Sequence, residues 1–184
     1  QFFHLSFTGI KSSGYRNKFL TAVSIVEAVS NLPIALYSGD AKSMQEAVKL
    51  CKEKRPLIIC GEKTFPDAFI KLAAENNLPL AVTCAGLEEA SEATAKARAA
   101  QVEEIVINLK EKSLSKRIQD FTYIRRSALK KNFRPLGYPI IAFTENADPD
   151  LELAEAVSYM VKYAGIVIMK NTDKEFVYPL LVAR

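Results

Sequence analysis

The sequence predicts an α/β protein with the architecture of a (β/α)8 TIM-type barrel in which about seven strand-helix units are present. Apolar segments of strand length alternate with helical segments along the chain. Strands such as IVIN at 105–108 and IVIM at 166–169 are apolar on both faces, which is typical of a parallel sheet covered by helices. Seven units exceed the roughly five or six strands of the usual open doubly wound parallel sheet and therefore favour a barrel. The open doubly wound sheet remains the alternative fold. The barrel would lack its last unit.

The strand segments are bounded by turn residues and helical patterns. We expect them at 2–10, 32–38, 56–61, 78–85, 104–109, 138–144 and 165–170. In the first strand, the odd positions 3–7 are apolar and suited to contact helices. The even positions 4–8 are polar and point toward a mixed barrel interior.

Two helix starts are well defined. Asp40 can cap a helix whose apolar stripe consists of Met44, Ala47, Val48 and Cys51. Asp148 precedes Pro149 and two further acids, so that a second helix has both a cap and a favourable charge at its positive end.

Composition limits the class of protein. The 184 residues fit a single domain, 1–184, and 49% of them are hydrophobic. A formal net charge of +4 is too small for a dedicated nucleic-acid binder. No apolar run has the roughly 18 residues of a membrane span, and the N-terminus is unlike a secretion signal, so we expect a cytoplasmic protein without membrane partners. Because the chain starts at Gln1 rather than Met, we expect an excised piece of a longer protein.

In a parallel barrel, chemistry takes place at the carboxyl ends of the strands. The polar or reactive residues expected there are Thr8, Ser38, Asp40, Cys60, Glu62, Cys84, Asn108, Thr144, Glu145 and Lys170. They form none of the familiar phosphate, dinucleotide, zinc-hydrolase or elbow-nucleophile motifs.

Most single candidates have a simpler structural interpretation. Cys60 and Cys84 end neighbouring strands and could meet as a thiol pair, but free cysteine commonly behaves as a small buried hydrophobe. Cys51 lies on a helix stripe, and His4 lies far from the expected active rim. Lys170 could form a Schiff base if desolvated, although a solvated lysine at the strand end is the simpler interpretation.

A basic stretch at 121–134 holds five cations in fourteen residues. If 114–131 is one helix, Arg125 lies within an apolar face, and we then expect it to be buried and paired. That face consists of Leu114, Ile118, Phe121, Ala128 and Leu129. A helix break near Asp120 or Thr122 would instead turn Arg125 outward.

After this helix, 134–137 suits a type I turn and Pro139 can open the next strand. Lys130 and Lys131 oppose the negative end of the helix dipole, which is a structural role. Arg125, Arg126 and Arg134 remain candidates for a partner interface or a structural ion pair.

The second half of the chain resembles the large (gamma) subunit of the corrinoid iron-sulfur protein of the acetyl-CoA synthase/CO dehydrogenase (acetyl-CoA decarbonylase/synthase) complex. The resemblance rests on DFTYIRRSALKKNFRPLGYPIIAF at 120–143, the acidic-capped helix, YMVKYAGIVIMK at 159–170 and EFVYPLL at 175–181. Earlier segments such as KRPLIIC and ENNLPLAV agree more loosely.

This resemblance implies that the chain is the family's central TIM-type barrel. It implies that the [4Fe-4S] and corrinoid domains are absent from this chain. No residue here is then expected to be catalytic or to bind a cofactor or a metal. It also implies pairing with the small subunit of the corrinoid iron-sulfur protein and contact with a methyltransferase and acetyl-CoA synthase during methyl transfer. The function expected is a scaffold and docking surface, and the alternative is a free-standing barrel enzyme such as a pterin-dependent methyltransferase or a lysine aldolase.

Overall fold

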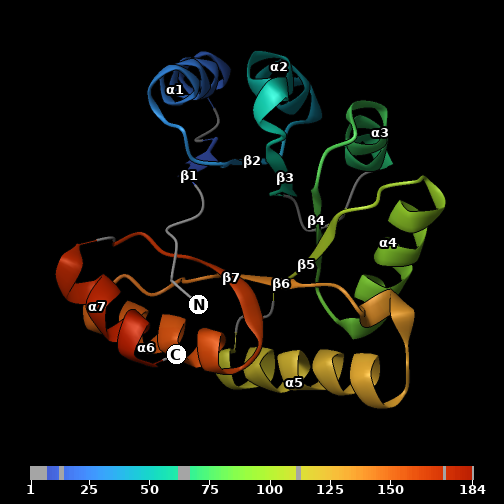
Figure 1. Ribbon diagram of the computed structural model, residues 1–184, viewed down its shortest axis with the longest axis vertical. Helices are drawn as coiled ribbons and strands as arrows, with labels where there is room; N and C mark the ends of the chain where they lie inside the picture. The colour runs from blue at the N-terminus through green and yellow to red at the C-terminus, as the bar shows by residue number, and fades with distance from the viewer. Residues whose placement is uncertain (1–7, 13–14, 62–66, 111–112, 172, 184) are drawn as a thin grey trace.

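Seven parallel strands lie in chain order in one sheet of the computed structural model (Figure 1). The structure describes residues 8–12, 15–61, 67–110, 113–171 and 173–183. The strands are β1 (Thr8–Lys11), β2 (Ile34–Ser38), β3 (Leu57–Cys60), β4 (Leu80–Cys84), β5 (Ile105–Leu109), β6 (Ile140–Phe143) and β7 (Ala164–Ile168). Each predicted strand is confirmed, although 2–7 of the first lies outside the described residues.

A helix follows every strand. The helices are α1 (Arg16–Val29), α2 (Ala41–Cys51), α3 (Asp67–Asn76), α4 (Leu87–Ala99), α5 (Leu114–Lys130), α6 (Pro149–Val161) and α7 (Lys174–Ala183). Two short 3-10 helices, η1 (Lys52–Lys54) and η2 (Arg134–Leu136), precede β3 and β6. Among the described helices, none is both long enough and apolar enough to cross a membrane.

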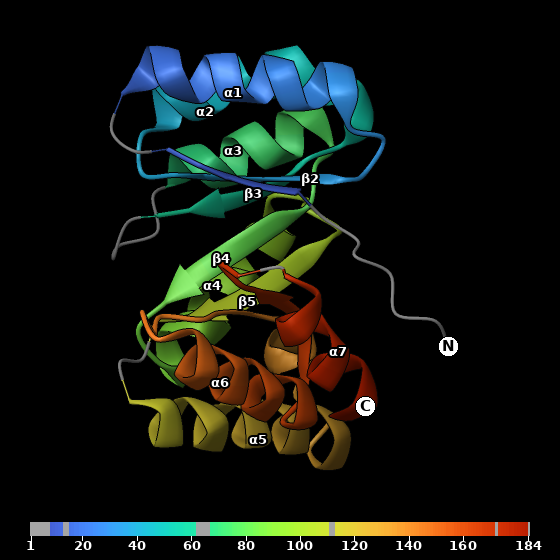
Figure 2. The same cartoon turned by 90° about the vertical axis from the view of Figure 1, so that its left-hand side faces the viewer.

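The sheet curls into an open barrel with the helices on its outer side (Figures 1 and 2). Neighbouring strands pair in parallel from β1 to β7, and within the described residues β1 and β7 are the two edges. A doubly wound sheet would instead reverse its strand order near the middle. The barrel prediction is therefore confirmed and the open doubly wound alternative is wrong.

Strand residues alternate between two apolar layers. Leu36, Ile58 and Leu80 belong to the large core beneath the helices. Ala35, Leu57, Ile59, Ala81, Val106 and Ile141 form a smaller cluster on the other face of the sheet, which is the barrel interior. Because both faces are covered, the central strands read as continuous apolar runs.

Local capping confirms both predicted helix starts. The carboxylate of Asp40 accepts hydrogen bonds from the backbone N–H groups of Lys42 and Ser43, at 3.2 and 2.9 Å, and Asp148 accepts two at the start of α6. The predicted stripe of α2 is buried. The turn at 134–137 is confirmed by the hydrogen bond from the Gly137 N–H to the Arg134 carbonyl, 2.9 Å.

α5 has the predicted length but not the predicted orientation. Its buried residues are Arg117, Asp120, Phe121 and Ile124, spaced as one helical face. Leu114 and Leu129, which we expected inside, are exposed, and so is Arg125. The burial of Arg125 and the helix break are therefore both wrong, because one continuous helix turns a different face inward and that face contains Arg117.

Candidate functional site at the carboxyl ends of β6 and β7

Two carboxylates of α6 lie beneath the segments that leave β6 and β7. Glu152 and Glu155 belong to the buried face of α6, together with Ala156 and Tyr159. The spacing of these four residues is that of a helical stripe facing the core. Buried carboxylates must be hydrogen-bonded or paired, because an uncompensated charge in the interior is costly.

Glu152 joins the ends of both strands. Its Oε1 accepts hydrogen bonds from the Thr144 hydroxyl after β6, at 2.5 Å, and from the Lys170 N–H after β7, at 2.7 Å. Its Oε2 accepts from the N–H and the side-chain amide of Asn171, at 3.3 and 2.6 Å. One fully buried carboxylate therefore holds two loops together.

Glu155 and Tyr159 connect the same region to α5. Glu155 Oε2 accepts from the N–H groups of Glu145 and Asn146, at 3.0 and 3.2 Å. Its Oε1 accepts from the Tyr159 hydroxyl at 2.5 Å and lies 3.5 Å from Nη1 of Arg117. The Tyr159 hydroxyl in turn accepts a hydrogen bond from Arg117.

Arg117 is the buried cation of this network, with 3% of its side chain exposed. Besides Glu155 and Tyr159, it donates to the Phe143 carbonyl and to Glu145 Oε1, both at 3.2 Å. Its guanidinium lies 5.4 Å from the centre of the Tyr159 ring. Glu145 is largely exposed, whereas Glu155 is a buried counter-charge.

The pKa values follow from this geometry. Burial acts to raise the pKa of Glu152, but hydrogen bonds from Lys170, Thr144 and Asn171 hold it below the usual glutamate value. Burial likewise opposes ionisation of Glu155, and its hydrogen bonds together with the Arg117 charge lower its pKa. Burial and the Glu155 carboxylate raise the pKa of Tyr159. At neutral pH, Arg117 therefore faces ionised Glu155 and a neutral phenol.

The sequence interpretation missed Arg117, Glu152, Glu155 and Tyr159. A signal was present, since acids at 152 and 155 share a helical face with Ala156 and Tyr159. The network fastens the ends of β6 and β7 to α5 and α6, which is a structural task.

Aromatic and polar side chains project into the barrel interior near the carboxyl ends of the strands. Tyr37 of β2 and Phe143 of β6 meet edge to face, with ring centres 5.5 Å apart. The Lys11 ammonium lies 5.3 Å from the Tyr37 ring centre. Asn108 donates to the Thr83 hydroxyl at 3.1 Å, and that hydroxyl donates to the Cys60 carbonyl at 2.8 Å.

The remaining strand-end candidates fall in separate places. Ser38 Oγ accepts a hydrogen bond from the Asp40 N–H at 3.1 Å, so that both residues shape the start of α2. Thr8 begins β1 beside Ile34, the first residue of β2, and therefore lies at the opposite end of the sheet from the one we expected. Glu62 and His4 lie outside the described residues.

Lys170 is exposed, and its Nζ donates to the carbonyls of Glu145 and Asn146, at 3.2 and 2.9 Å. This is the solvated strand-end lysine of the simpler interpretation, not the desolvated amine that a lysine aldolase requires.

The three cysteines are buried. Cys60 and Cys84 belong to the core beneath the helices, so they face away from the barrel interior, and Cys51 lies on the buried stripe of α2. Burial raises the pKa of Cys51 to about 11 and that of Cys84 to about 12. The interpretation as small buried hydrophobes is confirmed.

Arg125, Arg126 and Arg134 are all exposed. Among the described residues, none of the three forms an ion pair with a carboxylate. Arg125 and Arg126 lie on α5, and Arg134 lies on the η2 turn that follows it.

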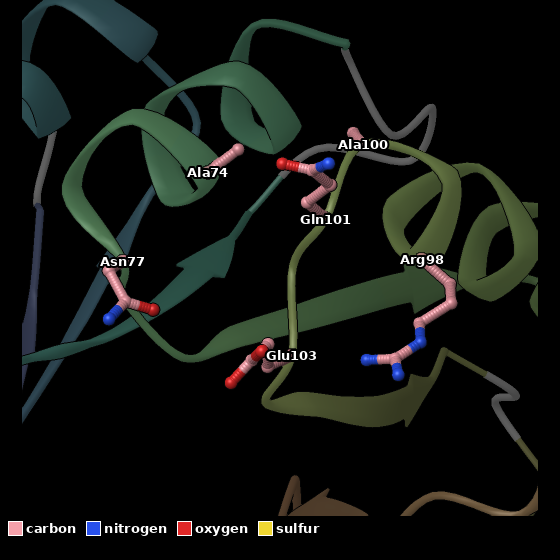
Figure 3. A pocket seen from close by; sticks show the side chains of 6 residues that line it. All are labelled: Ala74, Asn77, Arg98, Ala100, Gln101 and Glu103. Atoms are coloured by element: carbon pink, nitrogen blue, oxygen red, sulfur yellow. The ribbon is translucent and has the colours of Figure 1, made fainter.

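Two surface hollows lie at the amino ends of the strands, away from this region. One, of about 520 Å³, is bordered by polar side chains that include Asn77, Arg98, Gln101 and Glu103, where α3 and α4 end (Figure 3). The other, of about 510 Å³, includes Pro33, Pro79 and Pro139 among its lining residues. None of the described candidate residues at the strand ends lines either hollow.

Comparison with solved structures identifies the fold. Dihydropteroate synthase of Thermus thermophilus in complex with 4-aminobenzoate aligns with 96% of this chain and 82% of its own, with a TM-score of 0.70 and 14% sequence identity. The enzyme of Vibrio fischeri aligns with 97% of this chain and 79% of its own, at a TM-score of 0.63 and 17% identity. At these identities the likeness concerns the barrel fold alone.

Comparison of sequences identifies the family. The corrinoid/iron-sulfur protein large subunit of Moorella thermoacetica is 40% identical over 163 residues, which are 89% of this chain and 36% of that protein. The acetyl-CoA decarbonylase/synthase complex subunit gamma of Methanocaldococcus jannaschii is 26% identical, over 94% of this chain and 40% of that protein. The chain thus spans well under half the length of these relatives. The family model described as CO dehydrogenase/acetyl-CoA synthase delta subunit matches residues 1–184, and the chain belongs to this family.

Proposed function

We propose that this chain is the scaffold and subunit-docking barrel of a corrinoid iron-sulfur protein, a cytoplasmic methyl carrier. In this proposal the assembled protein passes a methyl group from a methyltransferase to acetyl-CoA synthase in one-carbon metabolism. The barrel itself carries out no catalysis.

The observation that carries this proposal is that the buried charged side chains at the carboxyl ends of β6 and β7 are bonded to other groups of the barrel. Arg117, Glu152 and Glu155 are buried and hydrogen-bonded to neighbouring protein groups. A catalytic acid or base must instead reach a substrate proton directly or through one water. These groups are engaged in holding the barrel together, and a well-fixed barrel suits a support for other subunits.

The cysteines do not fit a resident iron-sulfur cluster. Such a cluster is usually held by four thiolates that converge on one site, whereas the sequence has three cysteines. Cys51 comes from the buried face of α2, and Cys60 and Cys84 come from strand ends. Within the described ranges, no three His, Cys, Asp or Glu side chains are grouped as a metal site would need. We therefore assign the [4Fe-4S] cluster and the corrinoid to other parts of the assembled protein.

The partner that we propose is the small subunit of the corrinoid iron-sulfur protein, with the methyltransferase and acetyl-CoA synthase as further partners. The relatives from Moorella and Methanocaldococcus are both named as subunits, which supports a role in assembly. Arg125, Arg126 and Arg134 are exposed, so we assign them to a partner interface rather than to internal ion pairs.

The test is a binding measurement with the small subunit. The two purified chains are mixed, and their masses are determined by light scattering during size-exclusion chromatography. We expect one species with the summed mass of both chains. Separate elution at micromolar concentrations, with both chains folded by circular dichroism, would contradict the docking function.

A further inference from the structure

The exposed side of α5 and the turn after it form what we call the α5 basic patch: Tyr123, Arg126, Leu129, Lys130, Phe133 and Arg134. From Phe121 to Thr144 the sequence has five cations and no acid. Among the described residues, none of these five cations is paired with a carboxylate. The patch therefore presents positive charge that the chain itself leaves unbalanced.

Apolar side chains are interspersed with these charges. Leu129 is 62% exposed, Tyr123 47% and Phe133 42%. A turn of 100° per residue places Arg126, Leu129 and Lys130 opposite the buried face of α5 that contains Arg117 and Ile124, and places Tyr123 at the flank of that face. Figures 1 and 2 show α5 on the outer side of the barrel, where this face is open. Arginine and aromatic residues are enriched at protein interfaces, whereas a purely solvated helix face needs no exposed aromatic.

The end of the patch is held in a fixed conformation. Asn132 has a positive φ of 49°, and the N–H groups of Lys131 and Phe133 both donate to the Ser127 carbonyl, at 3.2 and 3.1 Å, which closes the end of α5. The η2 turn is attached to α4 by the hydrogen bond from the Thr94 hydroxyl to the Pro135 carbonyl, 2.6 Å. A surface ordered in advance loses little conformational entropy when it binds.

We infer that the α5 basic patch binds an acidic protein surface with an apolar centre, presented by another subunit of the same assembly. Leu129 and Phe133 would enter the apolar centre, and Arg126, Lys130 and Arg134 would meet carboxylates around it. This inference rests on the proposed docking function and specifies which surface performs it. A protein partner fits better than a nucleic acid, because the chain's net charge is small and the exposed apolar groups include a leucine that no base would stack upon.

The test compares two double variants with equal changes in charge. Arg126→Glu/Arg134→Glu alters the patch, and Lys42→Glu/Lys71→Glu alters exposed lysines of α2 and α3, on the opposite side of the barrel (Figure 1). A third variant, Phe133→Ala, removes an apolar group without changing charge. The dissociation constant for the small subunit is measured at two salt concentrations. Hydrogen exchange of the backbone amides of 123–134 is compared in the free chain and in the complex with the small subunit.

We expect the patch variant and Phe133→Ala each to raise the dissociation constant by roughly tenfold or more. The control should stay within about twofold of wild type, since distant surface charges contribute little. Only Arg126→Glu/Arg134→Glu should lose the salt dependence of the dissociation constant. The backbone amides of 123–134 should exchange hydrogen more slowly in the complex. Both charge variants should have the melting temperature of the wild type, because the changed side chains are exposed, and circular dichroism should show that Phe133→Ala remains folded.

Three results would overturn the inference in distinguishable ways. Wild-type affinity in the patch variants would place the interface elsewhere and leave the docking function intact. Failure of the wild-type chain to bind would contradict the docking function and this inference together. Binding of duplex RNA or anionic vesicles that the patch variant loses, with unchanged affinity for the small subunit, would assign the patch to another class of partner.

Discussion

Arg117 and Glu155 form a buried ion pair between α5 and α6, with 3.5 Å between Nη1 and Oε1. Both side chains are almost inaccessible to water, and each makes further hydrogen bonds to backbone groups near the end of β6. Breaking a buried pair by removing one partner leaves a charge without compensation in the interior. The pair therefore makes the packing of α5 against β6 depend on one arginine.

Arg117→Met should lower the free energy of unfolding by about 3–5 kcal/mol, because Glu155 would remain buried without its cation. Arg125→Met is the matched control on the same helix, and its effect should stay within about 0.5 kcal/mol, since Arg125 is exposed. Urea denaturation of both variants measures the difference. Equal effects of the two substitutions would mean that the buried face of α5 is not the one described.

The contrast between these two arginines shows how much the sequence could predict. The strands were predictable because helices cover the sheet, so nearly every strand position is apolar. The orientation of α5 was not predictable from the positions of its apolar residues, because its buried face contains Arg117 and Asp120 while Leu114 and Leu129 are exposed. Arg117 can be buried because it pairs with Glu155 and Tyr159, which lie on another helix far along the chain. Helical periodicity is a local pattern and contains no information on such contacts.

Glu152 should make stability depend on acid pH. Its pKa lies below the ordinary glutamate value in the folded chain, so the unfolded chain binds protons more readily. The stabilisation from Glu152 is therefore fully present above the ordinary value of 4.5 and is lost as the pH falls through the lower folded pKa. Glu155 has a pKa shift in the same direction and adds to this loss.

Glu152→Gln separates this contribution from the rest. At pH 7 it should destabilise the chain by about 1–3 kcal/mol, since the four groups that face Glu152 are donors and an amide nitrogen cannot accept from them. The difference from wild type should shrink as the pH falls below 4.5. Glu92→Gln, at an exposed position of α4, serves as the control. A difference that is constant from pH 7 to acid pH would contradict the assignment.

The cysteines should resist modification in the folded chain. The thiolate is the reactive form, and burial raises the pKa of Cys51 to about 11 and that of Cys84 to about 12. Cys60 is fully buried as well. A disulfide reagent such as Ellman's reagent at pH 8 should label none of the three within minutes, and all three once the chain is unfolded in guanidinium. Rapid stoichiometric labelling of the native chain would show an accessible thiol and would reopen a role for Cys60 and Cys84.

We expect the chain alone to bind neither an iron-sulfur cluster nor a corrinoid stoichiometrically. A cluster needs converging thiolates, and here Cys60 and Cys84 face the helix layer while Cys51 lies on α2. A corrinoid needs a pocket that holds the macrocycle and admits the methyl donor, whereas the rings of Tyr37 and Phe143 occupy the barrel interior near the strand ends. The chain is mixed separately with a cobamide and with iron and sulfide under anaerobic conditions, then desalted, and its visible spectrum is recorded. The same treatment of the chain bound to the small subunit shows whether assembly creates a site. Stoichiometric absorbance retained by the isolated chain would overturn the scaffold function, because the barrel would then hold the group that performs the chemistry.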